Sequence, residues 1–420
     1  MSYSIPQKDA GQGTIQAGHY LWIVLPLVLG AMLVQALIGM GIPVLYPFIQ
    51  VEFGLSHAQV GLITSTYAIG GLTTVLLAGW LTDYLGAKRM ISISLVSMTV
   101  FIAAFPLAHS WHIVLALVVI LSVSGSPMYP ATTRAVMDWV PGRIRGLAMS
   151  LKQTGPPIAG ALAAAILPIL ALAVGWRMAA ASMGILILFT AIAFLSLYRD
   201  APRGKEAMHR LNISTLRVIL QNRRAVTIAI WGGTFVGLQF TVLSYFILFL
   251  MEELQLSPIM AGGMLSIAQV SSIIARILWG SVSDFIFHRR RIAVLVIAGF
   301  MTVIGLLGAS IMTADVPGSA VFLLAITIGT STFSFHGVLT ALIGETADTG
   351  QVGTTTGFSN TLMRTGTLVV PPIFGYLVDV SSSYSLSWRV AAGAALVSTL
   401  ALLAFGREPR REHLSGISHR

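Results

Sequence analysis

Long, continuously apolar runs separated by short polar breaks make up most of this sequence. A hydrocarbon core of roughly 30 Å takes about 20 residues of helix to cross, and most of the runs reach that length. Because the runs do not alternate between apolar and polar residues, a closed β-barrel is excluded. The pattern predicts twelve membrane-spanning helices, at residues 20–43, 56–78, 90–110, 112–137, 146–174, 178–198, 225–251, 258–282, 291–313, 318–344, 353–378 and 386–406.

Composition strengthens this prediction. Of the 420 residues, 55% are hydrophobic and only 10% are charged, whereas a soluble domain is about a quarter charged. Such a chain cannot cover its surface with polar groups, so part of its solvent must be lipid. We therefore expect an all-α, multi-pass membrane protein. The polar first 19 residues carry one lysine, so no cleavable signal peptide is expected before the first span.

The formal net charge of +10 is explained by where the basic residues lie. Of 25 lysines and arginines, Arg177 and Arg389 are assigned to one side and Lys152, Arg276 and Arg364 to the membrane; the other 20 lie in the termini or in loops after even-numbered spans. This asymmetry is the positive-inside pattern, which predicts two cytoplasmic termini and a place in the cytoplasmic (inner) membrane. No nucleic-acid partner is needed, and the absence of cysteine excludes disulfides and thiol chemistry.

Internal similarity predicts two halves. The most polar internal stretch, 199–224, separates residues 1–198 from 225–406, and 407–420 form a polar tail. "GWLTDYLGAKR" (79–89) is matched by "GSVSDFIFHRR" (280–290), and "GLAMSLKQTG" (146–155) by "GFSNTLMRTG" (357–366). Parallel repeats of this kind are the plan of many transporters, whose substrate site lies between the repeats near the midplane.

The first of these loops resembles the signature of the major facilitator superfamily. The matching residues are Gly79, Leu81, Asp83, Gly86, Lys88 and Arg89, while Tyr84 and Ala87 replace two family arginines. The second copy keeps Gly280, Asp284 and Arg290, with Phe287 in place of a glycine. The resemblance implies a fold of two six-helix halves in which the aspartate lies against a helix N-terminus, where a carboxylate is favoured, and helps to hold one access state. The alternative is a set of solvated loop charges.

Three cations lie inside predicted spans, and the acidic residues all lie near span ends. Each cation would cost about 2.5–3.5 kcal/mol at a helix centre facing lipid, so we expect the three to face a wet cavity or to snorkel. Arg364 is midway along its span, with Asn360 on the same face one turn earlier. We interpret Arg364 as a substrate contact, with a structural arginine bonded to carbonyls as the alternative.

Arg276 shares a helical face with Gln269 and Ser272. Its surroundings, R-x-x-x-G-x-x-S-D, resemble the eighth span of oxalate and monocarboxylate transporters of the superfamily, which implies that Arg276 binds a substrate carboxylate. In the repeat, Gln153 corresponds to Arg364, so Lys152 lies one residue from the same depth in the other half. The resemblance places the fifth and eighth spans side by side across the cavity, which brings Lys152 towards Arg276. Snorkelling remains the alternative for Lys152.

Polar and aromatic residues on inward helices complete the expected lining. His336 is the only histidine well inside a span and is a candidate for carrying a coupling proton. Ordinary packing is the alternative for each of these residues. The other candidates are Gln35, Tyr46, Tyr129, Trp231, Gln239 and Tyr245.

These features predict a monomeric secondary transporter for a small organic anion, a carboxylate above all, driven by proton symport or by anion exchange. A proton-coupled drug exporter is the main alternative, although cationic drugs normally need a buried carboxylate. An inorganic-anion transporter is a third, although the fifth span lacks the glycine–asparagine pattern of nitrate porters. The sequence has no phosphate loop, metal-ligand cluster or nucleophile constellation, so we expect neither an enzyme nor a cofactor.

Overall fold

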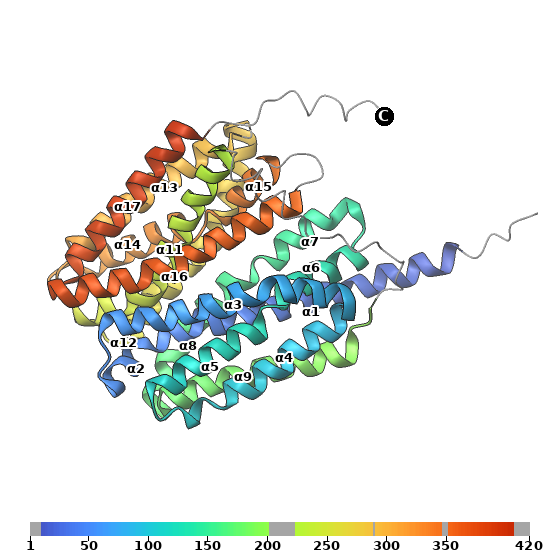
Figure 1. Cartoon of the computed structure of the whole chain (residues 1–420), viewed down its shortest axis with the longest axis horizontal. Helices are drawn as coiled ribbons and strands as arrows, with labels where there is room; N and C mark the ends of the chain where they lie inside the picture. The colour runs from blue at the N-terminus through green and yellow to red at the C-terminus, as the bar shows by residue number, and fades with distance from the viewer. Residues whose placement is uncertain (1–9, 201–222, 289, 347–351, 407–420) are drawn as a thin grey trace, which may run out of the picture.

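The structure is a computed structural model that describes residues 10–200, 223–288, 290–346 and 352–406. Helices connected by short turns make up nearly all of this part of the chain (Figure 1). Within it, ten helices are long and apolar enough to cross a membrane, or eleven when the bent pair His57–Thr74 and Leu77–Leu85 counts as one span. The prediction of an all-α membrane protein is confirmed.

The helices before residue 201 form one bundle, which we call the N-terminal bundle. Three of its spans are interrupted: α1 is followed by α2, α5 by α6, and α7 by α8. Pro156 and Pro157 lie in the first turn of α8, where the missing N–H of proline costs nothing because the first helical N–H groups have no intrahelical acceptor. The helices are α1 (Ala10–Gly41), α2 (Tyr46–Phe53), α3 (His57–Leu85), α4 (Ala87–Ala103), α5 (Trp111–Gly125), α6 (Met128–Trp139), α7 (Arg145–Lys152), α8 (Gly155–Val174) and α9 (Trp176–Leu197).

The helices after residue 222 form the C-terminal bundle. Its interrupted span is made of α14 and α15, and a short π-helix, Val282–Ile286, extends α12. The helices are α11 (Arg223–Glu252), α12 (Pro258–Ser281), α13 (Arg291–Ser310), α14 (Gly318–Ser331), α15 (His336–Thr346), α16 (Val352–Ser381) and α17 (Tyr384–Phe405). Residues 201–222 and 407–420 lie outside the described residues, so the predicted boundaries of linker and tail stay predictions.

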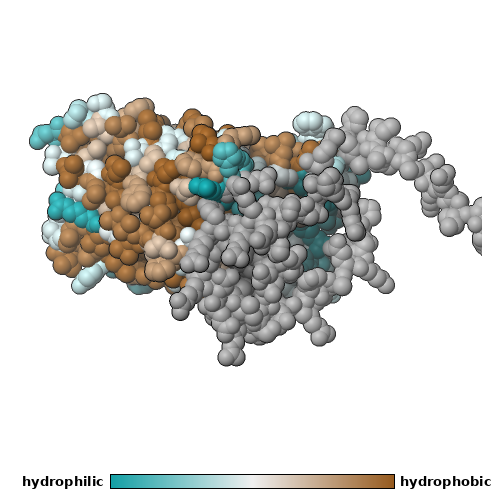
Figure 2. Space-filling model, turned by 90° about the horizontal axis from the view of Figure 1, so that it is seen from above, coloured by the Kyte–Doolittle hydropathy of each residue, from teal (hydrophilic) through white to brown (hydrophobic). Residues whose placement is uncertain are grey.

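Large apolar side chains lie on the outside of both bundles. Phe189 of α9 is 66% exposed and Leu323 of α14 is 63% exposed. Figure 2 shows a broad hydrophobic surface over much of the visible face, with hydrophilic residues towards its ends. A water-facing surface of this size would be unfavourable, whereas lipid tails accept it without cost.

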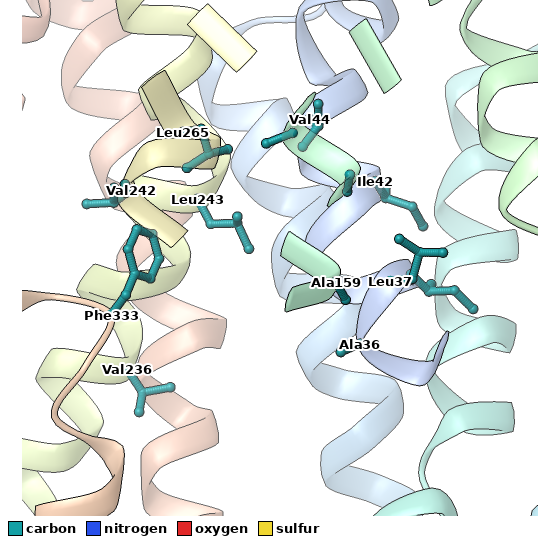
Figure 3. Packing of buried hydrophobic residues seen from close by; sticks show 14 of the residues in the cluster. Ala36, Leu37, Ile42, Val44, Ala159, Val236, Val242, Leu243, Leu265 and Phe333 are labelled. Atoms are coloured by element: carbon teal, nitrogen blue, oxygen red, sulfur yellow. The ribbon is translucent and has the colours of Figure 1, made fainter. Parts of the chain in front are cut away.

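The two bundles meet along two seams. One seam is formed by α3 and α16, and the other by α8 and α12. Between the seams, buried apolar side chains fill the interior. In Figure 3, Ile42 and Val44 lie on the side of the N-terminal bundle, and Leu243 and Leu265 lie on the side of the C-terminal bundle.

Each seam has two ends, which we name by the nearest short helix. At the α2 end lie the turns at Gly54, Gly175 and Ser382. At the α7 end lie the turn at Gly86 and the connection at 140–144. Gly86 joins α3 directly to α4 with φ +92°, a conformation that residues with a β-carbon rarely adopt.

Candidate functional site

Both deep arginines lie on a seam. The α3–α16 seam runs from Asp379 at the α2 end, through a hydrogen bond of 2.6 Å from Ser65 Oγ to the Leu368 carbonyl, to Arg364. Arg364 packs on Gly71 so closely that a β-carbon at that glycine would overlap its Nη1 atom. The glycine therefore makes room for the guanidinium of the opposite bundle.

The surroundings of Arg364 are polar but carry no carboxylate in the described residues. Within that part of the chain, Arg364 forms no hydrogen bond or ion pair with another side chain or carbonyl. One turn before Gly71, the Tyr67 hydroxyl accepts a hydrogen bond of 3.3 Å from Gln35 Nε2. Ser122 Oγ donates to the Tyr67 carbonyl and fixes this turn of α3. The side chain of Asn360, the predicted companion of Arg364, lies outside the described part.

Arg276 lies on the α8–α12 seam and is bonded to backbone. Its Nη2 atom donates to the Phe333 carbonyl at 3.0 Å, and Nη1 approaches the Gln153 carbonyl at 3.4 Å. Both carbonyls lie where a span is interrupted, between α14 and α15 and between α7 and α8, and carbonyls at helix ends lack intrahelical partners. Arg276 thus bridges the breaks of two bundles, while its buried Nε atom has no partner among the described residues.

Lys152 ends α7 and is buried, with 1% of its surface exposed. Its ammonium donates to Thr133 Oγ1 at 2.5 Å and to the Tyr129 carbonyl at 3.3 Å, and it lies 4.3 Å from the centre of the Tyr129 ring. These neutral partners hold the charge inside the N-terminal bundle, so the side chain does not snorkel. Next to it, Gln153 Nε2 approaches the Tyr129 hydroxyl at 3.5 Å.

Of three further candidates, Gln239 and Gln269 are buried and His336 is half-buried. Gln269 packs on Gly160 of the opposite bundle, and its Nε2 atom has no partner within the described chain. His336 begins α15, and its Nε2 atom lies 2.6 Å from Gln239 Oε1. The imidazole also stacks on Phe335. His336 and Gln239 therefore form a pair within the C-terminal bundle.

The remaining lining candidates have packing or seam partners. Trp231 stacks on Phe235 and donates to Thr399 Oγ1 at 3.4 Å, inside the C-terminal bundle. The Tyr46 hydroxyl lies 2.9 Å from Thr64 Oγ1. The Tyr245 hydroxyl bonds carbonyls of α3 and α16 near the α2 end. The structure does not bring Trp231, Tyr46 or Tyr245 together with Arg276 or Lys152.

In the first loop, Asp83 lies at the end of α3 and pairs with Arg134 of α6 at 2.8 Å. Arg134 also meets Asp138 at 3.6 Å, the pair that the i,i+4 spacing predicts. The carboxylate that accepts the Lys88 N–H at the start of α4 belongs to Asp200. Among the described residues, Asp83 therefore pairs with a guanidinium of its own bundle, and the contact with a helix N-terminus that the resemblance implies stays a prediction. The other loop candidates near this turn are Gly79, Gly86 and Arg89.

In the second loop, Asp284 lies in the π-helix after Gly280 and pairs with Arg291 at 2.6 Å. Arg291 also meets Glu345 of α15 at 3.3 Å. Arg290 is exposed and precedes α13. Both loop aspartates thus have guanidinium partners within their own bundle.

A cluster that the sequence analysis did not single out lies at the α2 end. It is formed by His57 of α3, Glu252 of α11 and Asp379 of α16. The signal was weak, because charged residues at span ends are common and these three are far apart in the chain.

Comparison with known proteins gives a family and relatives. The profile of the Major Facilitator Superfamily matches residues 27–366. The chain is 25% identical to the hexuronate transporter of Bacillus subtilis, covering 86% of this chain and 89% of that one. It is 25% identical to a probable sulfoacetate transporter of Cupriavidus necator, covering 90% and 93%. It is 23% identical to a probable galactarate/D-glucarate transporter of Escherichia coli K12, covering 84% and 87%.

Solved structures share the fold. The D-xylose-proton symporter superposes with a TM-score of 0.78 at 16% identity, covering 93% of this chain and 99% of that one. The nucleoside transporter NupG gives 0.75 at 15% identity, covering 91% and 98%.

Proposed function

This chain belongs to the Major Facilitator Superfamily, and we propose that it is a secondary transporter that moves a small organic anion, a carboxylate in the first instance. The observation that carries the proposal is the set of positively charged side chains at the two seams. Arg364 and Arg276 lie on the two seams and Lys152 is buried beside one of them, with no carboxylate partner to any of them among the described residues. Uncompensated buried cations are unfavourable unless an anion visits them.

The three cations would act differently. Arg364 has no hydrogen-bond acceptor among the described residues, so it can offer a planar fork to a carboxylate, which makes a bidentate, charge-assisted pair. Arg276 would give up a hydrogen bond to a backbone carbonyl and form one to the substrate. Lys152 would contribute a positive charge from behind Tyr129 and Gln153. Relatives named for hexuronate, sulfoacetate and galactarate/D-glucarate carry anions of this chemistry.

Transport would follow alternating access. The N- and C-terminal bundles would rock against each other around the seams, driven by proton symport or by exchange of one anion for another, with His336 as a candidate proton carrier. The excess of lysine and arginine in the loops of the α7 end and in the termini supports a cytoplasmic position for that end, in the cytoplasmic membrane. We propose that one copy of the chain suffices.

The test is counterflow in vesicles that contain the purified protein. Vesicles are loaded with one unlabelled monocarboxylate, dicarboxylate or sulfonate and are then given the same compound in labelled form outside. We expect uptake of the label for at least one of these anions and no exchange of neutral sugars or cationic drugs. The same series with an imposed pH gradient separates symport from exchange. Exchange of a cationic drug and of no anion would overturn the proposal in favour of a drug exporter.

A further inference from the structure

The cluster at the α2 end is made of titratable groups that join the two bundles. His57 is the first residue of α3, while Glu252 ends α11 and Asp379 lies in the last turn of α16. The imidazole Nδ1 lies 2.8 Å from Asp379 Oδ1, and Nε2 lies 2.8 Å from Glu252 Oε2. Each side chain keeps between 20% and 39% of its surface exposed, so solvent at this end can reach the cluster.

The geometry of the cluster requires a bound proton. A neutral imidazole has one N–H, and its other nitrogen can only accept a hydrogen bond. Ionised carboxylates can only accept as well. Both ring nitrogens of His57 face a carboxylate oxygen, so two hydrogen bonds form only if one extra proton resides on the imidazole or on a carboxylate.

Two phenol hydroxyls donate hydrogen bonds around this bridge. Tyr384 of α17 donates to Glu252 Oε2 at 2.9 Å, and the Tyr245 hydroxyl donates to the His57 carbonyl at 2.7 Å. Glu253 adds a further negative charge next to Glu252. The groups that face His57 from α11, α16 and α17 are thus carboxylates and phenols. Gly375 lets α16 approach the start of α3 closely, since a β-carbon at this glycine would overlap the His57 carbonyl.

We propose that His57, Glu252 and Asp379 form a regulatory proton-binding site, and that a proton bound there holds the α2 end closed. Opening this end must separate His57 from both carboxylates, because they belong to different bundles. A protonated imidazole is favoured between two carboxylates and loses that advantage in the open state, so the closed state binds the proton more tightly.

Linkage fixes the sign of the pH effect. The proton's contribution to closure is fully present below the ordinary imidazole pKa of about 6.5 and is lost as pH rises above it. With one linked proton, the ratio of open to closed molecules grows by up to about tenfold per pH unit in the pH range above about 6.5 over which the proton is lost from the closed state. Acid in the compartment that faces the α2 end therefore favours molecules open at the α7 end.

A distance measurement tests this without any substrate. The chain has no cysteine, so Val51→Cys in α2 and Val380→Cys in α16 place one spin label on each bundle at the α2 end. Both positions are exposed, at 84% and 66%. In the labelled parent protein in nanodiscs, we expect a short distance at pH 5.5 and a growing longer component between pH 6.5 and pH 8.

His57→Gln should remove the pH dependence, because glutamine keeps hydrogen bonding but does not titrate in this range. His112→Gln is the matched control, since His112 lies at the start of α5 at the same end and its ring contact is with Trp111 of its own bundle; it should behave like the parent. Asp379→Asn offers a second variant if His57→Gln unfolds, and it should also flatten the pH response. Thermal unfolding of each variant checks the fold.

A closed end that is too stable could hide the response, so the same series is run with Tyr245→Phe, which removes the one hydroxyl donor that the His57 and Pro371 carbonyls share at the α2 end. A distance distribution that is identical at pH 5.5 and pH 8 in both backgrounds overturns the proposal. An unchanged pH response in both His57→Gln and Asp379→Asn overturns it as well. Neither outcome depends on which anion is carried, so failure here is separable from failure of the counterflow test.

Discussion

Arg364 and Arg276 share a residue type and a place on a seam, but their hydrogen-bond donors have different partners. Arg276 spends two donors on the carbonyls of Phe333 and Gln153, which lie at helix breaks. Arg364 lies against Gly71 without a hydrogen-bond acceptor among the residues that the structure describes. An arginine on a seam can therefore stabilise the protein through hydrogen bonds to backbone carbonyls, or it can be available to bind a ligand. The two roles predict different effects of substitution.

Arg364→Gln should give the largest effect. Removing a charge-assisted bond costs about 1.5–3 kcal/mol, which is roughly a tenfold to hundredfold loss of anion affinity. The unfolding temperature should not fall, because no described protein acceptor loses its donor. Counterflow and thermal unfolding on the same preparation measure both quantities. Normal anion exchange by this variant would contradict the role of Arg364 and remove the main support for an anion substrate.

Arg276→Gln should combine a loss of affinity with a loss of stability. Two carbonyls in part-buried hydrogen bonds lose their donor, and an unsatisfied buried group costs about 1–3 kcal/mol. The unfolding temperature should therefore fall, in contrast to Arg364→Gln. Equal stability of the two variants would show that the carbonyl contacts of Arg276 contribute little, and the distinction between the arginines would disappear.

Arg364→Lys should have an intermediate effect. Lysine keeps the charge but lacks the planar fork, so a bidentate contact with a carboxylate becomes a single one. We expect about a tenfold weaker affinity, which corresponds to the loss of about 1.4 kcal/mol. Titration of binding at constant ionic strength measures it, and a lysine variant with parental affinity would show that only a point charge is recognised.

Asp83→Asn should have the smallest effect on binding. Its pair with Arg134 is exposed and lies within one bundle, far along α3 from Gly71. Affinity should stay within about threefold of the parent, since exposed pairs contribute roughly 0–1 kcal/mol. The rate of counterflow should fall if this loop controls the interchange of access states. A parallel loss of affinity would place Asp83 closer to the site than the structure does.

Sequence predicted the spans well because each is a local property of some twenty consecutive residues. The three membrane cations were equally visible, since a single charge in an apolar run is conspicuous. What each cation contacts was not predictable: the acceptors of Arg276 are backbone carbonyls, and any residue type supplies those. The break between α14 and α15, which exposes the Phe333 carbonyl, is not marked by a proline or a glycine in the sequence.

Aromatic candidates illustrate the same limit. Trp231, Tyr245 and Tyr129 have similar local surroundings in sequence, yet one packs, one joins the bundles and one lies under Lys152. Direction around the helix axis separates them, and an apolar span gives little information about direction. Tyr67 and Gly71 were missed because neither carries a charge.

The Asp379 carboxylate has a second role, because it accepts hydrogen bonds from the backbone N–H groups of His57 at 2.8 Å and Ala58 at 2.9 Å. One bundle thereby caps a helix of the other, and these bonds do not depend on the side chain at position 57. How firmly the α2 end closes and how steeply closure answers to pH are thus separate quantities. A homologue with another side chain at position 57 could keep the hydrogen bonds from the α3 backbone to the carboxylate and lose the pH dependence. Transporters adapted to acidic and to neutral surroundings could therefore differ here by a single residue.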